Sequence, residues 1–375
     1  MKNKRTTIIF TDEPYIESAQ AIKDYLATDI NNLTIIIGED EFRSIPFKLI
    51  VERFFSEDGA VRRFAQKTRF KLSSLMMDKR PKGLPKFNSK KASHVTAYNI
   101  LIRYNPDLII LNDASLIEDV LVARDKAMPD IPIIMVITDY VLDLRIADNK
   151  IDKFFVENMA IKTTLVNNNI PEDKVIISDF PINPVFDKKT NKAALFSEFG
   201  FSIDKPLVLV STPLTDAVGI RQTFDILSEQ KQYYNIVVDC GKDRNLLTHA
   251  HQSDLVAINE GRSSFPLYEH ASIVIGRPQP LAIAKTLYAG GLYFLLEPRG
   301  EREQRIFQFL SAAGVIVPVF NIAALIACLK DFLDDSDAYT TVRKAIAAHN
   351  EKRPRGVLFK NIELMLDMKI INSQS

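Results

Sequence analysis

The chain of 375 residues is poor in cysteine and histidine and carries almost no net charge. Its two cysteines, Cys240 and Cys328, lie far apart and fit no metal-binding or redox spacing, which is typical of a reduced cytoplasmic protein. The histidines form no metal-binding set, because neighbours such as His249 and His251 point to different faces of a helix. A net charge of +1 gives no global attraction for nucleic acid. We therefore expect no bound metal and no nucleic-acid partner.

Long hydrophobic runs are also missing. The longest, "AAGVIVPVFNIAALIACL", is interrupted by Pro318 and Asn321, so it does not predict a membrane span. The amino-terminal "MKNKRTTIIF" has too short an apolar stretch for a signal peptide. We expect a cytoplasmic protein that is either soluble or peripheral on the inner face of the cell membrane.

Short β-branched runs alternate with longer helical stretches, the pattern that parallel strands and helical crossovers produce. The expected strands cover residues 6–11, 33–38, 107–112, 131–138, 153–158, 174–179, 206–212, 235–241, 254–259, 271–277, 292–297 and 315–319. A chain of this length exceeds the size at which a single core keeps growing. We therefore predict an α/β protein with two Rossmann-like open-sheet domains facing across a cleft, with ligands at the carboxyl ends of the strands.

Prolines and polar residues separate the two sets of strands. The predicted amino-terminal domain covers residues 1–186, and a linker at residues 187–204 joins it to a carboxyl-terminal domain at residues 205–336. Helices are expected in residues 337–375.

A basic segment at residues 48–91 interrupts the first domain. It carries thirteen lysines and arginines against four acidic residues, interleaved with aromatic and aliphatic side chains. This composition is typical of an element that docks on an anionic lipid surface, and equally of a solvated helical hairpin that packs on its own domain. Nucleic acid is a weaker alternative, since no base-reading motif accompanies the charge. The predicted membrane-surface residues are Arg62, Arg63, Lys67, Arg69 and Lys71.

A charged loop follows the apolar run "GGLYFLL". The sequence "EPRGEREQRIFQFL" at residues 297–310 places six charged residues within nine positions and then continues as an apolar helix. The carboxyl end of a strand that leads into a helix is where α/β sheets usually hold a ligand. The alternative is a charged first helical turn, because acidic residues are favoured at a helix amino terminus.

Arg277 ends another predicted strand and precedes the next helix. Helix amino termini bind phosphate through free amides, and an adjacent cation adds a charge-assisted contact. The alternative is a surface arginine at the end of a strand.

Five short motifs occur in order between residues 106 and 186. They are Pro106–Asp107 before an apolar strand, "IPIIMVITD", "IDKFFV", "NIPEDKV" and "PINPVF". In the second half, "YEHASIVIGRPQPLAIAKTLYAGG" and "EPRGEREQRIFQFLSAAGVIV" extend the match. Together they resemble the monogalactosyldiacylglycerol synthase and processive diacylglycerol glucosyltransferase family, over roughly residues 45–335.

The resemblance implies a GT-B fold and the transfer of a hexose from a UDP-sugar to a lipid hydroxyl, with the UDP-sugar as co-substrate and no further cofactor. It implies that Glu303, with Gln304 beside it, accepts hydrogen bonds from the ribose hydroxyls of the donor. It also implies that the helices in residues 337–375 cross back to the first domain. The remaining donor-binding candidates are Ser211, Thr212, Gly219, Arg277, Gln279, Leu281 and Lys285.

The acceptor side departs from the family pattern in two places. The opening turn lacks the glycines and the histidine of the family's G-G-G-H and carries Asp12 and Glu13, either of which is a candidate general base or an ordinary helix cap. The family's histidine after the "TD" strand is also absent, which makes Asp139 a further candidate for the base.

The donor side departs as well. In "PQPLAIAK", Gln279 and Pro280 replace two glycines and Lys285 replaces a glutamate, so that Pro280 removes an amide donor while Lys285 adds positive charge. The loop "VLVSTPLTDAVGI" keeps only Gly219 of a glycine-rich turn. The favoured function is a hexosyltransferase that acts on a lipid or lipid-linked acceptor at a membrane surface. The alternatives are a GT-B transferase with a non-lipid acceptor and a catalytically degenerate scaffold that binds or regulates a partner.

Overall fold

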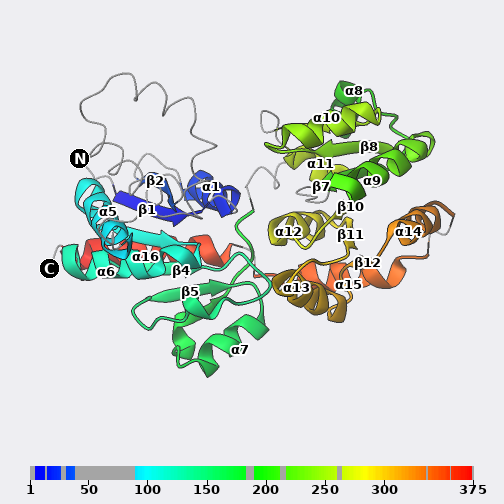
Figure 1. Ribbon diagram of the computed structural model, residues 1–375. Coiled ribbons are helices and arrows are strands. Elements are labelled where there is room, and N and C mark those ends of the chain that lie inside the picture. Colours follow the sequence, from blue (N-terminus) through cyan, green and yellow to red (C-terminus); the bar gives the residue numbers. More distant parts are fainter. Residues whose placement is uncertain are drawn as a thin grey trace, which may run out of the picture.

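The computed structural model describes residues 5–12, 15–26, 31–38, 89–182, 190–211, 217–259, 264–334, 337–354 and 356–373. Within these ranges the strands form two six-stranded parallel sheets, which lie side by side in Figure 1 with helices around each. All twelve predicted strands are present, with small differences at their ends. The prediction of an α/β protein with two open sheets is therefore confirmed.

The first sheet has the strand order β2-β1-β3-β4-β5-β6. Its strands are β1 (Arg5–Thr11), β2 (Asn31–Ile37), β3 (Leu108–Leu111), β4 (Ile133–Val136), β5 (Lys153–Val156) and β6 (Val175–Ile177). Its helices are α1 (Ile16–Leu26), α5 (Ser89–Tyr104), α6 (Ile117–Ala127) and α7 (Met159–Asn167). Side chains alternate between the faces of a strand, so Ile8 and Phe10 of β1 join the core under α5, α6 and α7, whereas Ile9 joins the core on the α1 side.

The second sheet has the strand order β12-β11-β10-β7-β8-β9. Its strands are β7 (Leu207–Ser211), β8 (Asn235–Asp239), β9 (Val256–Ile258), β10 (Ala271–Gly276), β11 (Leu292–Leu296) and β12 (Val317–Val319). The helices in this half are α8 (Lys192–Phe199), α9 (Ala217–Glu229), α10 (Arg244–Gln252), α11 (Phe265–His270), α12 (Pro280–Ala289), α13 (Glu301–Ala312) and α14 (Ile322–Asp334). The predicted linker contains helix α8, whose Phe196 is buried in the core of the second sheet. Packing of the second half thus begins before residue 205.

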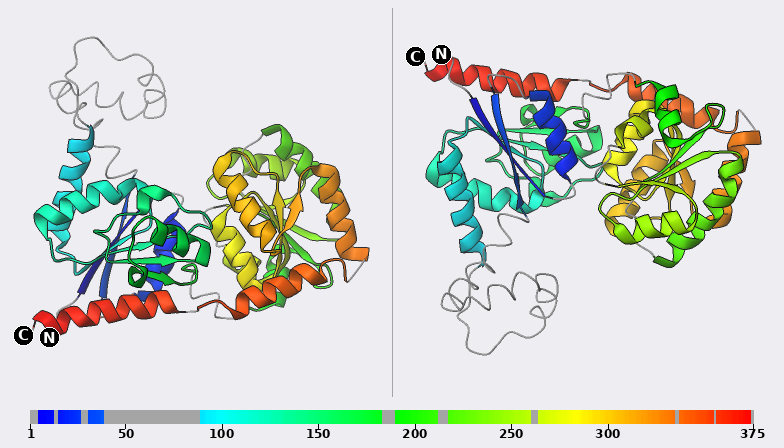
Figure 2. Two further views of the ribbon diagram at one scale, coloured as in Figure 1. Left: turned by 90° about the horizontal axis from the view of Figure 1, so that it is seen from below. Right: turned by 90° about the horizontal axis from the view of Figure 1, so that it is seen from above.

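The last two helices connect the halves. α15 (Thr340–Glu351) lies against the second half, where the Asn350 side chain donates a hydrogen bond to the Leu287 carbonyl at 2.6 Å. α16 (Val357–Ser373) runs along the first half in both views of Figure 2, and its Leu358, Phe359 and Ile362 are buried in the core with α1. The carboxyl-terminal segment therefore packs on the second half through α15 and then on the first half through α16.

The predicted membrane contacts lie outside the part of the chain that the structure describes. Residues 39–88 are outside the described ranges, and they include Arg62, Arg63, Lys67, Arg69 and Lys71. Among the residues that are described, no helix has both the length and the apolar character needed to span a bilayer. Docking of the basic segment on a lipid surface stays a prediction.

Each sheet has one point where the strand order reverses. In the first sheet it lies between β1 and β3, and in the second it lies between β7 and β10. Crossover helices leave to opposite faces at such a point, which opens a crevice beyond the carboxyl ends of the two strands. The topology therefore predicts ligand binding in these two crevices.

Candidate active site between the two sheets

A cavity lies at each of the two reversal points. The first-sheet cavity has a volume of about 750 Å³ and is lined from the ends of β1, β3 and β4 and from α13. The second-sheet cavity has a volume of about 590 Å³ and is lined from the ends of β7 and β8, from α12 and from α1. Tyr15, Thr138 and Arg302 line both cavities. The two spaces are therefore adjacent, and these three residues form the boundary between them.

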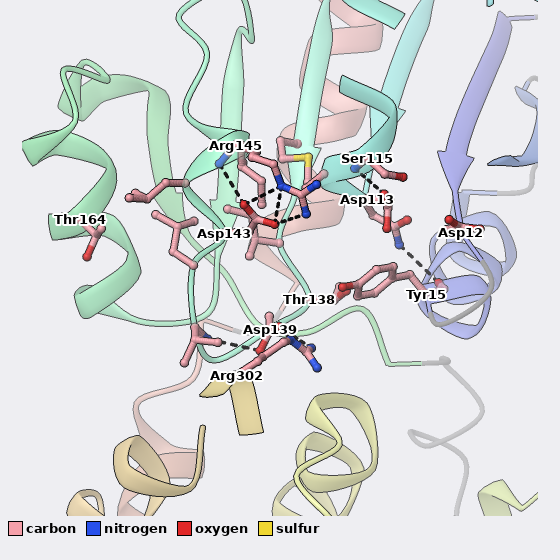
Figure 3. Close-up of a pocket in the computed structure, with 18 of the residues that line it drawn as sticks. Asp12, Tyr15, Asp113, Ser115, Thr138, Asp139, Asp143, Arg145, Thr164 and Arg302 are labelled. Atoms are coloured by element: carbon pink, nitrogen blue, oxygen red, sulfur yellow. Dashed lines mark hydrogen bonds and ion pairs between the residues drawn. The ribbon is translucent and has the colours of Figure 1, made fainter. Parts of the chain in front are cut away.

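The first-sheet cavity is rich in carboxylates. Asp12, Asp113, Asp139 and Asp143 all line it, and Figure 3 shows them around a common space with Tyr15 and Arg302. Asp12 follows β1 directly and is buried. The structure thus brings two predicted base candidates, Asp12 and Asp139, into one cavity, whereas Glu13 lies outside the described residues.

Asp139 is held by Arg302 across the two halves. Its Oδ2 accepts hydrogen bonds from Arg302 Nε at 2.9 Å and Nη2 at 2.5 Å, and its Oδ1 accepts from the Tyr140 amide at 2.7 Å. Burial raises the pKa of Asp139 above its ordinary value, and the Arg302 guanidinium partly offsets this rise. Figure 3 shows the two side chains pointing toward one another. Both carboxylate oxygens of Asp139 are therefore already engaged as acceptors, Oδ2 by Arg302 and Oδ1 by the Tyr140 amide.

Five of the nine predicted donor residues line the second-sheet cavity. They are Ser211, Gln279, Leu281, Lys285 and Glu303. Of the other four, Arg277 is buried and Gln304 is exposed on α13, and neither lines the cavity, while Gly219 lies in α9 and Thr212 is outside the described residues.

Arg277 and Glu303 bind each other. Arg277 is buried, and its Nη2 donates to Glu303 Oε2, which also accepts from the Arg299 amide at 2.7 Å. The Arg277 carbonyl in turn accepts a hydrogen bond from the Tyr293 hydroxyl at 2.9 Å. Arg277, the predicted phosphate-binding residue, and Glu303, the predicted ribose-binding residue, therefore bind each other. One oxygen of Glu303 is already engaged.

Lys285 is the buried cation of the second-sheet cavity. It is 3% exposed, and its Nζ forms an ion pair with Glu17 of α1, from the other half of the molecule. The same Nζ lies 4.5 Å from the ring centre of Phe265 and 5.0 Å from that of Tyr268. The two rings stabilise a positive charge that has little contact with water.

The sequence did not point to several residues of the site. Tyr15, Glu17, Asp239, Tyr268 and Arg302 line the cavities but were not predicted as site residues. Two of them carried a usable signal, because Asp239 lies near the end of a predicted strand and Arg302 stands in the charged loop after another. Among the described residues, no group of three or more histidine, cysteine or acidic side chains is arranged to hold a metal ion.

Sequence comparison supports the resemblance that the motifs indicated. The family model for monogalactosyldiacylglycerol (MGDG) synthase matches residues 63–182. A processive diacylglycerol beta-glucosyltransferase of Bacillus pumilus (strain SAFR-032) is 22% identical over 274 residues, which are 71% of this chain and 70% of the relative. The corresponding protein of Staphylococcus carnosus (strain TM300) is 21% identical over 278 residues, with 72% and 70% covered.

Solved structures share the arrangement of both halves. UDP-GlcNAc 2-epimerase from Neisseria meningitidis, bound to UDP-GlcNAc, superposes with a TM-score of 0.58 at 13% identity, covering 91% of this chain and 94% of the epimerase. MurG from Acinetobacter baumannii superposes with a TM-score of 0.55 at 10% identity, covering 96% and 99%. A glycosyltransferase from Rickettsia africae gives 0.55 at 13% identity, covering 97% and 98%. The chain has the GT-B fold, and its sequence resembles the monogalactosyldiacylglycerol synthase and processive diacylglycerol glucosyltransferase group.

Proposed function

We propose that the protein is a glycosyltransferase that moves a hexose from a UDP-sugar to a lipid or lipid-linked acceptor at a membrane surface. The observation that carries this proposal is the pair of adjacent cavities, one at each reversal point, with a boundary made by Tyr15, Thr138 and Arg302. A transfer between two substrates needs two sites whose contents meet at one place. The named activities of the Bacillus and Staphylococcus relatives supply the reaction class.

The second-sheet cavity suits a nucleotide diphosphate. Lys285 and Arg302 supply positive charge to it, and the amino terminus of α12 begins at its edge with Gln279 and Pro280. Helix amino termini and cations stabilise a diphosphate that leaves with two negative charges. Structures of the same fold hold UDP-GlcNAc and UDP, which supports a UDP-sugar as the donor.

The first-sheet cavity suits the acceptor hydroxyl. In the proposed step a carboxylate takes the proton of that hydroxyl, the oxygen bonds to the anomeric carbon of the donor, and the bond from that carbon to the diphosphate breaks. Asp12 and Asp139 both line this cavity and are our candidates for this role. A diphosphate in the neighbouring cavity would attract Arg302 away from Asp139, which would release that carboxylate for proton transfer.

A non-catalytic scaffold is the second candidate, and a specific observation favours it. The pairs Arg302–Asp139 and Lys285–Glu17 join charged groups that line the cavities, and Glu303 of the second-sheet cavity is paired with the buried Arg277. Pro280 also removes an amide at the start of α12. A protein of this kind would keep these three ion pairs and would bind no nucleotide.

Calorimetric titration with UDP, ADP and GDP separates the two candidates. We expect the protein to bind UDP selectively and Glu303→Ala to weaken UDP binding about tenfold or more, because a charge-assisted contact and the anchor of Arg277 are lost together. Gln308→Ala is the matched control, since Gln308 is exposed on the same helix α13 and lines neither cavity. UDP-dependent transfer of labelled hexose to diacylglycerol in vesicles then tests the acceptor. Absence of binding to any of the three nucleotides would favour the scaffold.

A further inference from the structure

Tyr15 lies where the two cavities meet. It directly precedes α1 and lines both cavities, and Figure 3 shows its ring reaching toward Thr138 and Asp139. Its main chain is fixed on both sides, because its amide donates to the Asp12 carbonyl at 2.9 Å and its carbonyl accepts from Asn112 Nδ2 at 3.4 Å. The side chain is therefore held at the boundary by contacts that do not involve its hydroxyl.

The Tyr15 hydroxyl is a neutral hydrogen-bond donor that a ligand can use. Within the described ranges, no residue forms a hydrogen bond with it. Burial raises the pKa of this hydroxyl above its ordinary value; Arg302 acts in the opposite direction, and the carboxylates of Asp139, Asp113 and Asp143 add to the rise. The proton therefore stays on the oxygen near neutral pH, and the hydroxyl can donate it to a hydrogen bond.

The two oxygens that react at the boundary need partners of opposite kinds. The acceptor oxygen gives up its proton, so its partner is a base, for which Asp12 and Asp139 are the candidates. The oxygen that joins the hexose to the diphosphate gains negative charge as its bond breaks, so its partner is a donor. A hydroxyl that keeps its proton cannot act as the base, whereas it suits the leaving oxygen.

The charges of the two cavities place this leaving oxygen near Tyr15. Lys285 is buried in the second-sheet cavity and Arg302 lies at its boundary, so both attract a diphosphate to that side. The carboxylates of the first-sheet cavity repel a diphosphate, which keeps it out of the acceptor site. The hexose then extends from the diphosphate toward the acceptor. The bond that breaks therefore lies at the boundary that Tyr15 shares with Thr138 and Arg302.

We infer that the Tyr15 hydroxyl donates a hydrogen bond to the diphosphate oxygen that leaves the anomeric carbon. This inference rests on the proposed function, because it assigns a catalytic residue to the same reaction. As the bond breaks, its electron pair stays on the leaving oxygen, while the acceptor oxygen bonds to the carbon and its proton passes to a carboxylate. Tyr15 keeps its own proton. Its hydrogen bond is strongest in the transition state, because the charge on the leaving oxygen develops only as the bond breaks.

Single-turnover kinetics of Tyr15→Phe test the inference, since this change removes only the hydroxyl. Two reactions of UDP-glucose are measured with the full chain in excess: transfer to diacylglycerol in vesicles, and hydrolysis by water without an acceptor. We expect both rates to fall about tenfold to a hundredfold, the range for a hydrogen bond to a charged group, because both reactions break the same bond. The affinity for UDP-glucose, measured by calorimetry without acceptor, should change about twofold or less.

Tyr25→Phe is the matched control, because Tyr25 is exposed on α1 and lines neither cavity. It should transfer and hydrolyse at the wild-type rates. A thermal melt of Tyr15→Phe should match that of the wild type, since the hydroxyl bonds to no described residue.

Each other outcome has a definite meaning. Wild-type rates in Tyr15→Phe would overturn the inference, and slower transfer with unchanged hydrolysis would do so too, because the hydroxyl would then act on the acceptor. A loss of affinity as large as the loss of rate would show a contact made equally in the ground state, and a large drop in melting temperature would show that the hydroxyl serves the fold; either would overturn the role at the leaving oxygen. A wild-type protein that cleaves UDP-glucose in neither reaction would overturn the proposed function itself.

Discussion

Arg302 is the charged residue at the boundary between the two cavities. Both of its hydrogen bonds to Asp139 end on the same oxygen, so the rigid guanidinium contributes Nε and Nη2 to one acceptor. Half of the side chain is exposed, and it also lines the second-sheet cavity. A lysine could offer a point charge here but not the planar pair of donors. The residue is therefore suited to exchange a carboxylate for a phosphate oxygen as its partner.

His349 provides the clearest pH dependence at the scale of one residue. It lies in α15 with its Nε2 3.7 Å from Glu157 Oε1, and burial together with Arg353 lowers its pKa below the ordinary value of 6.5. The unfolded chain therefore binds this proton more tightly than the folded one. Stability from this residue is complete above the unfolded pKa and is lost as the pH falls through 6.5 toward the folded pKa.

We expect His349→Gln to reduce the drop in melting temperature between about pH 7.5 and pH 5.5, because the glutamine takes up no proton. The measurement is thermal unfolding of both proteins across this range. His251→Gln is the control, since His251 is exposed on α10. A drop of the same size in wild type and His349→Gln would show that burial of His349 does not govern the acid sensitivity.

At the scale of elements, α16 joins the end of the chain to the first sheet. The ring of Phe359 stacks on Tyr25 of α1 with a centroid distance of 3.7 Å, and Phe359 is 7% exposed. Its neighbours in this core include Ile9 and Ile110 of the central strands. Since α16 follows the helices of the second half, its packing on the first sheet is one of the contacts that join the two halves.

Phe359→Ala should lower the free energy of unfolding by about 3–5 kcal/mol, the range for truncation of a buried aromatic side chain. Leu364→Ala on the same helix is the matched control, because Leu364 is 50% exposed and should cost less than about 0.5 kcal/mol. Urea unfolding followed by far-UV circular dichroism measures both, which suits a chain without tryptophan. Equal stability of the two variants would show that α16 contributes little to the fold.

The elements could be predicted because their signals are local. β-branched runs and the breaks between them identify all twelve strands, since burial on both faces of a parallel sheet leaves a nearly continuous apolar run. Helix α8 was missed because it begins in a polar stretch that resembles a linker, although its Phe196 is buried in the second core and Leu195 and Phe199 pack against that core. Three apolar residues at the end of a polar segment are too weak a signal without the fold.

At the scale of the whole molecule, the site depends on contacts that the sequence does not disclose. Asp139 and Arg302 are 163 residues apart, and Glu17 and Lys285 are 268 residues apart. Asp139, Lys285 and Glu303 were each predicted as site residues from their strands and helices. The partners of Asp139 and Lys285 depend on how the two halves face each other, and no local pattern encodes this; Glu303 pairs with Arg277 within the second half. The candidates were therefore identifiable one by one, while the ion pairs that engage them were not.

The pair Glu17–Lys285 tests whether ion pairs hold the halves together. Lys285 is almost fully buried, so Glu17→Gln leaves its charge with only the rings of Phe265 and Tyr268 and the field of Asp239. We expect this variant to lose up to about 3 kcal/mol, near the low end of the range for broken buried pairs, because Glu17 itself is 43% exposed. The combined change Glu17→Gln with Lys285→Met should recover most of the loss, since no buried charge then remains. Thermal unfolding gives the energies, and small-angle scattering shows whether the single variant also opens. If Glu17→Gln unfolds and scatters as the wild type does, α16 and the pair Asp139–Arg302 are sufficient to hold the halves together.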